Sequence, residues 1–325
     1  IPFFTSSITI MYILLFINGW AQGMGWPPCG RVMAHWFSLR ERGTKMAVWN
    51  TAHNIGGALV GPVAILGLAL FVDFHSTLYF PAIVALIFAA IGYILIRDTP
   101  QSCGLPSIEE YRNDYPANYT EKFEEEFSIK EILFEHVFNN RMLWMIAFAN
   151  VFVYLVRYGI FDWVPAYYKS IGLSTSESGV AWATFEIAGI PGTLICGWIS
   201  DKVFKGRRAP ATIIYMALTL IAVIVFWKNP THNAIGFLIY GPVMLIGVQA
   251  IDLVPKKAAG TAAGLTGFLG YFIGTALLAN IGIGYLIDHF SWDHVFILLI
   301  ISCVLAMLLS ATTWNREKRN LRIEK

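Results

Sequence analysis

Charged residues are scarce in this chain. Asp, Glu, Lys and Arg together make up 14% of its 325 residues, whereas hydrophobic residues make up 56% and the mean hydropathy is +0.59. A soluble globular domain carries about a quarter charged residues. The shortage of charge therefore excludes an ordinary soluble domain, predicts an all-α polytopic membrane protein, and leads us to expect the lipid bilayer rather than nucleic acid as a partner.

Cysteine is also scarce, and motifs for catalysis are missing. Cys29, Cys103, Cys196 and Cys303 fit no disulfide or metal spacing, and we expect them to pack as small hydrophobic side chains. The loops contain no metal cluster, nucleophile–base arrangement or nucleotide motif. We therefore expect no enzyme, no metal and no cofactor. The chain begins at Ile1, without an initiator methionine or a signal peptide.

Long apolar runs recur along the chain, separated by short polar breaks. Each run is long enough to cross a bilayer as a helix. The nine predicted spans are 7–33, 47–72, 79–96, 143–167, 180–199, 211–227, 234–251, 262–287 and 295–314. The pairs Gly260/Gly264 and Gly270/Gly274 have the small-xxx-small spacing that lets membrane helices pack closely, which favours a packing role over a phosphate-binding loop.

The basic residues of the loops orient these spans. One set of connections, "RVMAHWFSLRERGTK", "DKVFKGRR", "VPKK" and the tail "NREKRNLRIEK", is rich in Lys and Arg, whereas the alternate set holds two lysines and no arginine. The positive-inside rule places the basic set and the C-terminus in the cytoplasm. With nine spans, Ile1 then lies on the outer face, and we expect the chain to be truncated at its front.

The longest polar break divides the spans into three before it and six after it. Apolar residues at near-helical spacing in "EKFEEEFSIKEILFEHVF" predict a surface helix in this loop. Asn118 fits a glycosylation sequon, which has no role in a cytoplasmic loop. We expect a partial N-terminal half at 1–97, a central cytoplasmic loop at 98–141, and a six-helix C-terminal half with a cytoplasmic tail at 142–325.

One arginine lies deep inside a predicted span, in "VFVYLVRYGIFDW". A guanidinium at that depth is costly and needs partners. Asn150, Tyr154, Arg157 and Tyr158 share one helical face, at spacings of three and four. Arg157 is about 15 Å from the outer boundary of the span, which is too deep for easy snorkelling toward Asp162. The stripe favours a polar cavity in which the bidentate fork of Arg157 binds an anion.

A second polar stripe lies in the span 47–72 and contains Trp49, Asn50, His53, Asn54 and Gly57. A lone buried histidine is often structural, so this helix alone leaves the role of His53 open. Opposite an intramembrane arginine, His53 could donate a hydrogen bond to an anion and take up a proton as the anion arrives.

Two acidic residues also lie in or at the end of a predicted span. Glu186 is well inside a span, and we expect it to pair in the empty site with Arg157 or with a basic residue that is missing from this chain. Such a pair could also be a permanent structural bridge. Asp252 lies at the inner end of a span, where we expect water to reach it.

Two sets of segments resemble a known superfamily. "GWISDKVFKGRR", residues 197–208, resembles the signature of the major facilitator superfamily. Asp201 with Lys202, Arg207 and Arg208 could form a charge cluster that latches one conformation, although the positive-inside pattern alone could also explain these charges. "GWAQGMGWPPCGR", "VWNTAHNIGG", "RDTPQSCGLPSIEEYRNDYP", "VFVYLVRYGIFDW", "GFLIYGPVMLIG" and "PKKAAGTAAG" resemble its organophosphate:phosphate antiporters.

This resemblance covers essentially the whole chain. It implies a major facilitator fold that lacks its first three helices. It also implies a monomer that exchanges sn-glycerol 3-phosphate for inorganic phosphate across the bacterial inner membrane by alternating access. The alternatives left open are a hexose-phosphate:phosphate antiporter and a membrane sensor that binds a phosphate ester without transporting it.

The resemblance further implies a set of substrate-binding residues. Arg157 is expected to bind phosphate and His53 to contact the substrate. Six further positions match residues that line the same cavity: Tyr154, Trp26, Asn50, Tyr240, Tyr271 and Glu186. The family's arginine on the first helix and lysine on the second have no counterpart here. The connection before residue 234 is also shorter than the family pattern, so the adjoining helix end is expected to be distorted.

Overall fold

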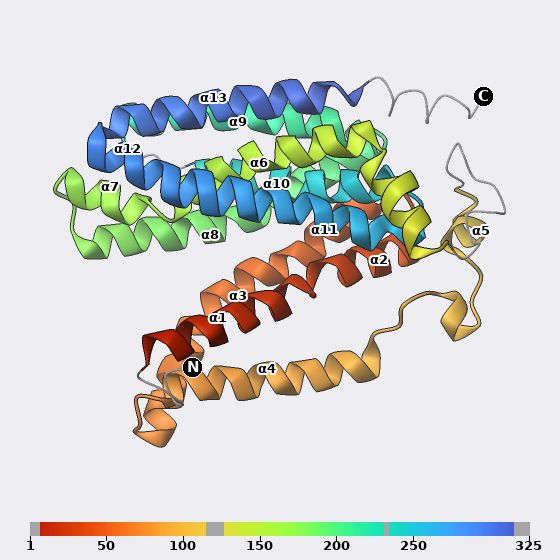
Figure 1. The fold of residues 1–325 in the computed structure, drawn as a ribbon, viewed down its shortest axis with the longest axis horizontal. Helices are drawn as coiled ribbons and strands as arrows, with labels where there is room; N and C mark the ends of the chain where they lie inside the picture. Colours follow the sequence, from red (N-terminus) through yellow and green to blue (C-terminus); the bar gives the residue numbers. More distant parts are fainter. Residues whose placement is uncertain (1–6, 115–126, 231–233, 315–325) are drawn as a thin grey trace.

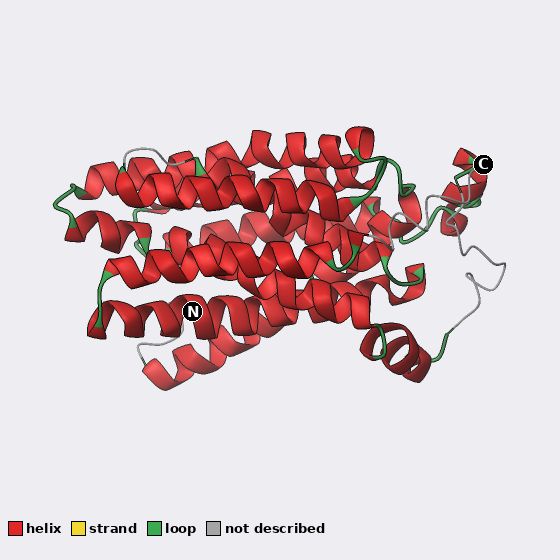
Figure 2. Cartoon of the chain, turned by 90° about the horizontal axis from the view of Figure 1, so that it is seen from above, coloured by secondary structure: helices red, strands yellow, loops and turns green. Residues whose placement is uncertain are grey.

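The computed structural model describes residues 7–114, 127–230 and 234–314, and this part of the chain contains helices and loops but no strand (Figure 2). The α-helices are α1 (Ile8–Gly23), α2 (Trp26–Trp36), α3 (Arg42–Phe71), α4 (Ser76–Leu95), α5 (Ile108–Arg112), α6 (Arg141–Phe161), α7 (Val164–Ser170), α8 (Thr175–Trp198), α9 (Arg208–Lys228), α10 (Ile235–Asp252), α11 (Ala259–Leu269), α12 (Ile283–His289) and α13 (Trp292–Ala311). Asn118 of the sequon and the basic tail 315–325 lie outside the described residues.

Nine long helical stretches in the described residues correspond to the nine predicted spans. Two are composite: α1 and α2 form the span Ile8–Trp36, and α11 continues through the π-helical segment Gly270–Gly282 into α12. Eight of the nine are long and apolar enough to cross a membrane by length and composition. The ninth, α8, has 24 residues. The predicted all-α polytopic membrane protein is confirmed.

The helices α6 and α8–α13 pack into a bundle, and α1–α3 cross it obliquely on one side (Figure 1). α10 lies inside the bundle, in contact with α6, α8, α9 and α11. The largest apolar cluster, which includes Val153, Tyr240 and Phe296, is within this bundle. α4 contacts α3 and buries none of its most apolar stretch, as a lipid-facing helix does.

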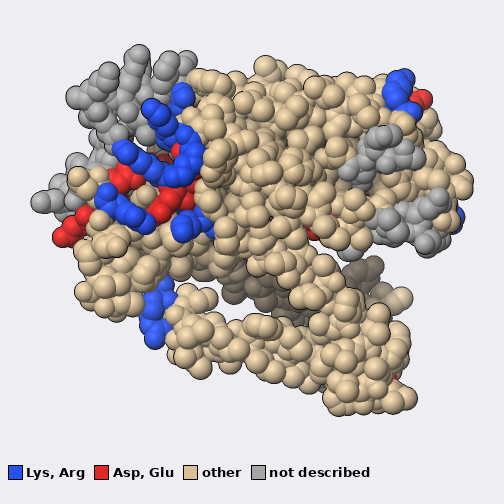
Figure 3. Space-filling view, turned by 180° about the vertical axis from the view of Figure 1, so that it is seen from behind, with Lys and Arg blue, Asp and Glu red and all other residues tan. Residues whose placement is uncertain are grey.

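Ion pairs gather at one end of the molecule, which we call the charged end (Figure 3). The pairs found there are Arg31–Asp98, Arg40–Asp114, Glu41–Arg112, Arg42–Asp252, Asp201–Arg208, Asp252–Arg208 and Glu109–Lys256. They come from three of the basic connections and the central loop, so the predicted grouping on one side is confirmed for these loops; the basic tail lies outside the described residues. α1 begins at the opposite end and α13 ends at the charged end (Figure 1).

The beginning of α6 is set by a cap. The Oδ1 atom of Asn140 accepts hydrogen bonds from the backbone N–H groups of Met142 (3.1 Å) and Leu143 (3.2 Å). Such a cap satisfies donors that have no partner inside the helix. From this fixed start, Arg157 lies about 24 Å along the helix axis. The cap thus fixes the place of Arg157 relative to the beginning of α6.

The surface helix predicted in the central loop is present just before α6. Ser128 and Glu131 form a capping box: the Ser128 N–H donates to Glu131 Oε2 (2.6 Å) and the Glu131 N–H donates to Ser128 Oγ (3.3 Å). The backbone N–H and then the hydroxyl of Ser128 lower the pKa of the Glu131 carboxyl. A π-helical segment, Glu131–Phe138, follows. The part of the predicted helix before residue 127 lies outside the described residues.

The glycine pairs pack as predicted. A Cβ added at Gly260 would lie 3.2 Å from the carbonyl oxygen of Pro27 in α2, and one added at Gly274 would lie 2.5 Å from the carbonyl oxygen of Val151 in α6. Glycine at these positions therefore lets the backbones approach closely. The distortion expected near residue 234 is not seen in the described residues, because α10 is continuous from Ile235 to Asp252.

Candidate functional site

Arg157 lies in the second half of α6, and its side chain is buried, with 5% of the residue exposed. Its Nη2 donates hydrogen bonds to His53 Nε2 (3.0 Å) and to the Tyr240 hydroxyl (3.5 Å). Its Cζ lies 4.6 Å from the ring centroid of Tyr240 and 4.8 Å from that of Tyr158, within cation–π range. The snorkelling alternative is therefore wrong, because the guanidinium points into the protein and not toward Asp162.

Among the residues that the structure describes, the charge of Arg157 has no acidic partner. No ion pair of the described residues includes it, and its Nε is buried without a hydrogen-bond partner there. A buried cation without a counter-ion is costly. The guanidinium therefore has both the charge and the free donor needed to hold an anion.

His53 extends from α3 toward Arg157. Because a guanidinium can only donate, Nε2 of His53 is the acceptor in their hydrogen bond, which places the imidazole proton on Nδ1. His53 as a whole is exposed, although its contact with Arg157 is partly buried. His53 is thus opposite the intramembrane arginine and in direct contact with it, which is the arrangement that favours a binding role, although the two positions are 104 apart in the sequence.

Glu186 lies in α8, 6% exposed, and is held by two neutral donors. The Tyr240 hydroxyl donates to its Oε1, and Asn54 Nδ2 donates to its Oε2 (2.8 Å) and to its backbone oxygen (3.2 Å). The expected direct pair between Glu186 and Arg157 is therefore wrong for this conformation. Tyr240 stands between the two charges and contacts both.

Three tyrosines form a wall beside Arg157. The ring centroids of Tyr154 and Tyr271 are 5.0 Å apart, those of Tyr158 and Tyr271 are 5.9 Å apart, and the two hydroxyl groups of Tyr158 and Tyr271 are 3.5 Å apart. Tyr271 is 50% exposed, whereas Tyr154 is buried. The wall therefore runs from the buried cation to an accessible surface.

Trp26 and Asn50 are not in contact with Arg157. The Trp26 ring packs against Trp49 at a tilt of 50°, with centroids 4.7 Å apart, and lies near Gly247 of α10. Asn50 is buried on α3, about one turn before His53 and therefore nearer the charged end. Asn150, from the stripe on α6, donates instead to the backbone oxygen of Thr266 (2.9 Å).

Two residues of the site were named in the polar stripes but not among the predicted binding residues. Tyr158 supplies an aromatic face to Arg157, and Asn54 holds Glu186. Tyr158 shares a helical face with Arg157, and Asn54 shares one with His53. These shared faces are the sequence feature that could have indicated a role in the site. Asn54 and Glu186 are 132 positions apart, which explains why the sequence pattern could not reveal their contact.

Toward the charged end, a buried ion network closes the space beneath the site. Asp252 pairs with both Arg42 and Arg208, and Arg208 also pairs with Asp201. Asp201 accepts from the backbone N–H groups of Gly43 (3.2 Å) and Thr44 (2.5 Å), at the beginning of α3. This position is favourable because the first N–H groups of a helix have no partner within it.

The predicted cluster is thus confirmed for Asp201 and Arg208 and wrong for two others. Lys202 is exposed, and the Nε of Arg207 donates to the Phe204 backbone (3.3 Å). The carboxylate of Asp252 lies between two arginines, and 14% of its side chain remains exposed, so water can reach it at the inner end of the span as predicted.

On the other side of the site, α3 separates from the bundle (Figure 1). A Cβ added at Gly56, Gly57 or Gly61 would meet no atom within 4 Å, and Ile55 and Val60 are 48% and 56% exposed. Since His53 and Asn54 still contact the bundle, the divergence begins directly after them. In the described part of the chain, the surroundings of Arg157 are therefore packed toward the charged end, whereas α3 is uncovered toward the opposite end.

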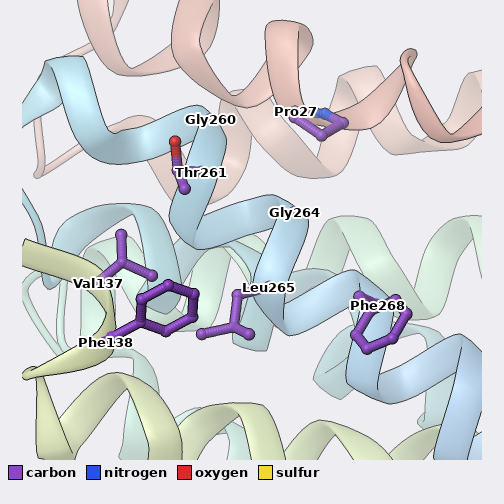
Figure 4. Close-up of a pocket in the computed structure, with 8 residues that line it drawn as sticks. All are labelled: Pro27, Val137, Phe138, Gly260, Thr261, Gly264, Leu265 and Phe268. Carbon is purple, nitrogen blue, oxygen red and sulfur yellow. The ribbon is translucent and has the colours of Figure 1, made fainter. Parts of the chain in front are cut away.

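A separate groove of about 430 Å³ lies between α2, the segment Glu131–Phe138 and α11 (Figure 4). It is lined by Pro27, Val137, Phe138, Gly260, Thr261, Gly264, Leu265 and Phe268. The side chains are apolar apart from one hydroxyl group, and none of the predicted site residues is among them. This groove does not have the chemistry of an anion site.

These features define a polytopic membrane protein with one buried cationic site that is open at one end and closed by ion pairs at the other. Residues 1–279 match the model of the Major Facilitator Superfamily, and the chain belongs to this superfamily.

Several relatives are similar over most of their length. The chain is 59% identical to the "Glycerol-3-phosphate transporter" of Bacillus subtilis (98% of this chain, 74% of the relative) and 49% identical to the protein of that name in Haemophilus influenzae (94% and 72%). It is 39% identical to a "Probable hexose phosphate transport protein" of Chlamydia trachomatis (98% and 74%).

Proposed function

We propose that this protein exchanges sn-glycerol 3-phosphate for inorganic phosphate across the bacterial inner membrane by alternating access. The observation that carries the proposal is the buried guanidinium of Arg157, which has no acidic partner in the described part of the chain. The similarity to proteins named glycerol-3-phosphate transporters supports the choice of substrate.

The charge of Arg157 explains why exchange would be obligatory. An unneutralised cation disfavours the closing of the site, because closing removes it further from water. A bound phosphate dianion neutralises it and offers oxygens in the planar geometry that a guanidinium fork matches. The protein can then change between its two open states only when the site holds an anion, so movement of one anion drives movement of the other.

The other residues take their roles from their places around Arg157. His53 contacts the guanidinium and would reach the same phosphate oxygens. Tyr154, Tyr240 and Tyr271 surround the cation, and Tyr271 lies where the organic part of a phosphate ester would extend. Trp26 and Asn50, nearer the charged end, would contact substrate after the other side opens.

The proposal also assigns the sides of the membrane. The charged end would be cytoplasmic, following the positive-inside rule, and the conformation described here would be open to the outside. Residues 1–97 and 142–325 would be the two parts that rock against each other, with 98–141 as the cytoplasmic connection. A single chain would form one transport pathway, because the site is built within one monomer.

The test replaces Arg157 by lysine in the protein produced from its complete gene and reconstituted in liposomes. An ammonium keeps the charge but loses the bidentate geometry, so exchange of labelled phosphate should fall by about 100-fold. Arg141→Lys, an exposed position at the first residue of the same helix, is the matched control and should retain exchange. Near-normal exchange by the Arg157→Lys protein would refute the proposal.

The same liposomes separate the alternatives. Counterflow of labelled hexose phosphate at a rate above that of glycerol 3-phosphate would favour a hexose-phosphate antiporter, as the name of the Chlamydia trachomatis relative suggests for that protein. Binding of a phosphate ester without any flux would favour a sensor.

A further inference from the structure

The carboxylate of Glu186 and the guanidinium of Arg157 are both buried in one site, yet they do not pair. Opposite charges in a low-dielectric interior attract strongly. Something must therefore keep the carboxylate in place, and both of its oxygens already accept hydrogen bonds from neutral groups.

Asn54 is one of these two donors and comes from a different part of the fold. It lies on α3, is 1% exposed, and its Nδ2 donates both to Oε2 and to the backbone oxygen of Glu186. The two acceptors determine how the amide is turned, because its own oxygen would face two acceptors if the group were flipped. This orientation leaves Asn54 Oδ1 buried without a partner in the described residues.

An unpaired buried acceptor costs about 1–3 kcal/mol. If the side chain at position 54 served packing alone, leucine would fill a similar volume without this cost. The amide is therefore positioned for what its Nδ2 group does, which is to hold the Glu186 carboxylate on the α3 side of α8.

We propose that Asn54 is a positioning residue that holds Glu186 away from Arg157, so that the substrate anion and not this carboxylate neutralises the arginine. This inference rests on the proposed function, because it concerns how the same site keeps its cation available. Without Asn54, Glu186 is held by Tyr240 alone and can turn toward Arg157, where it competes with phosphate for the guanidinium.

The experiment measures the Kd of inorganic phosphate for the purified protein, produced from its complete gene, by equilibrium dialysis in detergent. Asn54→Leu should raise this Kd about tenfold, which corresponds to about 1.4 kcal/mol. Asn280→Leu, the same change at an exposed position of the segment Gly270–Gly282, is the matched control and should leave the Kd unchanged.

A double-mutant cycle separates positioning from a general structural effect. In a Glu186→Gln background the competing carboxylate is gone, so Asn54→Leu should change the Kd by less than about twofold. A defect in folding or packing would instead weaken binding in both backgrounds and would overturn the proposal. Asn54→Ala, which introduces no larger group, repeats the cycle if the leucine variant does not fold.

The outcomes also distinguish this inference from the proposed function. If the unmodified protein does not bind phosphate, or if Arg157→Lys does not weaken binding, the proposed function fails. If both behave as expected and Asn54→Leu leaves the Kd unchanged, only the positioning role of Asn54 is wrong.

Discussion

At the residue scale, the site keeps two opposite charges close together without letting them meet. The hydroxyl of Tyr240 accepts from Arg157 Nη2 and donates to Glu186 Oε1, so it satisfies both groups at once. A direct ion pair would be more stable electrostatically but would occupy the guanidinium. The neutral hydroxyl leaves the positive charge uncompensated, and this is the property that an anion-binding site needs.

The Tyr240 hydroxyl is therefore expected to contribute to anion affinity. Tyr240→Phe keeps the ring over the Arg157 guanidinium but removes the donor to Glu186, and a hydrogen bond to a charged group is worth about 1.5–3 kcal/mol. We expect the Kd of phosphate to rise about tenfold or more, measured by equilibrium dialysis. Tyr215→Phe changes another buried tyrosine, whose hydroxyl donates to the backbone oxygen of Gly192 (3.4 Å), and should have little effect. Equal effects of the two changes would contradict this role.

The charged residues of the site could be found from sequence because charge is conspicuous inside an apolar span. Arg157 and Glu186 stood out for this reason, and His53 stood out on its polar stripe. Their partners could not be found in the same way. Tyr240 and Asn54 are common residue types, and their contacts with Glu186 join positions 54 and 132 residues apart.

At the element scale, the length and apolarity of the runs predict where the spans lie. The breaks within the spans have other causes. α1 and α2 are separate helices because Pro27 and Pro28 begin a new helix and cannot continue the hydrogen bonds of the previous one. The π-helical segment Gly270–Gly282 was predicted only as part of an uninterrupted span. Hydrophobic periodicity does not distinguish one helical hydrogen-bond pattern from another over so short a stretch.

The close contact of the segment Gly270–Gly282 with α6 holds the helix that carries Arg157. Gly274→Leu would place a Cβ 2.5 Å from the Val151 carbonyl oxygen and 3.0 Å from Tyr154 Cβ. Overpacking of this kind costs about 1–3 kcal/mol. We expect a lower melting temperature in detergent, followed by tryptophan fluorescence, together with weaker phosphate binding because Tyr154 shifts.

Gly267→Leu supplies the matched control for this packing. It makes the same change in the preceding helix α11, where an added Cβ meets no atom within 4 Å. Leucine has a higher helix propensity than glycine, so this variant should be as stable as the original protein or more so. If Gly274→Leu were equally well tolerated, the close approach of the two helices would not be required.

At the scale of the whole molecule, the ion network at the charged end determines which side of the site is closed. The sequence indicated that basic loops lie on one side and that Asp201 and Arg208 belong to a cluster. It could not indicate that Asp252 joins Arg42 and Arg208, because these residues are 210 and 44 positions from it. The opening of the molecule at one end thus depends on contacts that become visible only in three dimensions.

Asp252 is the central group of this network, since it is the one acid in the described residues that pairs with both Arg42 and Arg208. Asp252→Asn removes its charge and leaves each arginine with a weaker partner. Breaking a buried pair in this way costs about 3–5 kcal/mol. The substitution therefore destabilises the state that is closed at the charged end. We therefore expect the population to shift toward a state in which the charged end opens.

The shift can be followed at Met46, which is fully buried in α3 within the cluster beneath the site. Met46→Cys introduces a smaller side chain, in a background in which Cys29 and Cys103 are replaced by serine. A hydrophilic maleimide should label this cysteine several-fold faster when Asp252→Asn is added, because labelling requires α3 to leave the bundle at this end.

Asp293→Asn is the control for charge removal as such, since Asp293 lies at the opposite end and accepts a hydrogen bond from Trp227 (2.8 Å). It should leave the labelling rate at Met46→Cys unchanged. Saturating phosphate should further change the rate of maleimide labelling in the Asp252→Asn protein. A substrate site that holds phosphate can close, whereas closing of the empty site is disfavoured. An unchanged labelling rate in Asp252→Asn, or an equal increase in Asp293→Asn, would mean that the network does not hold the charged end closed.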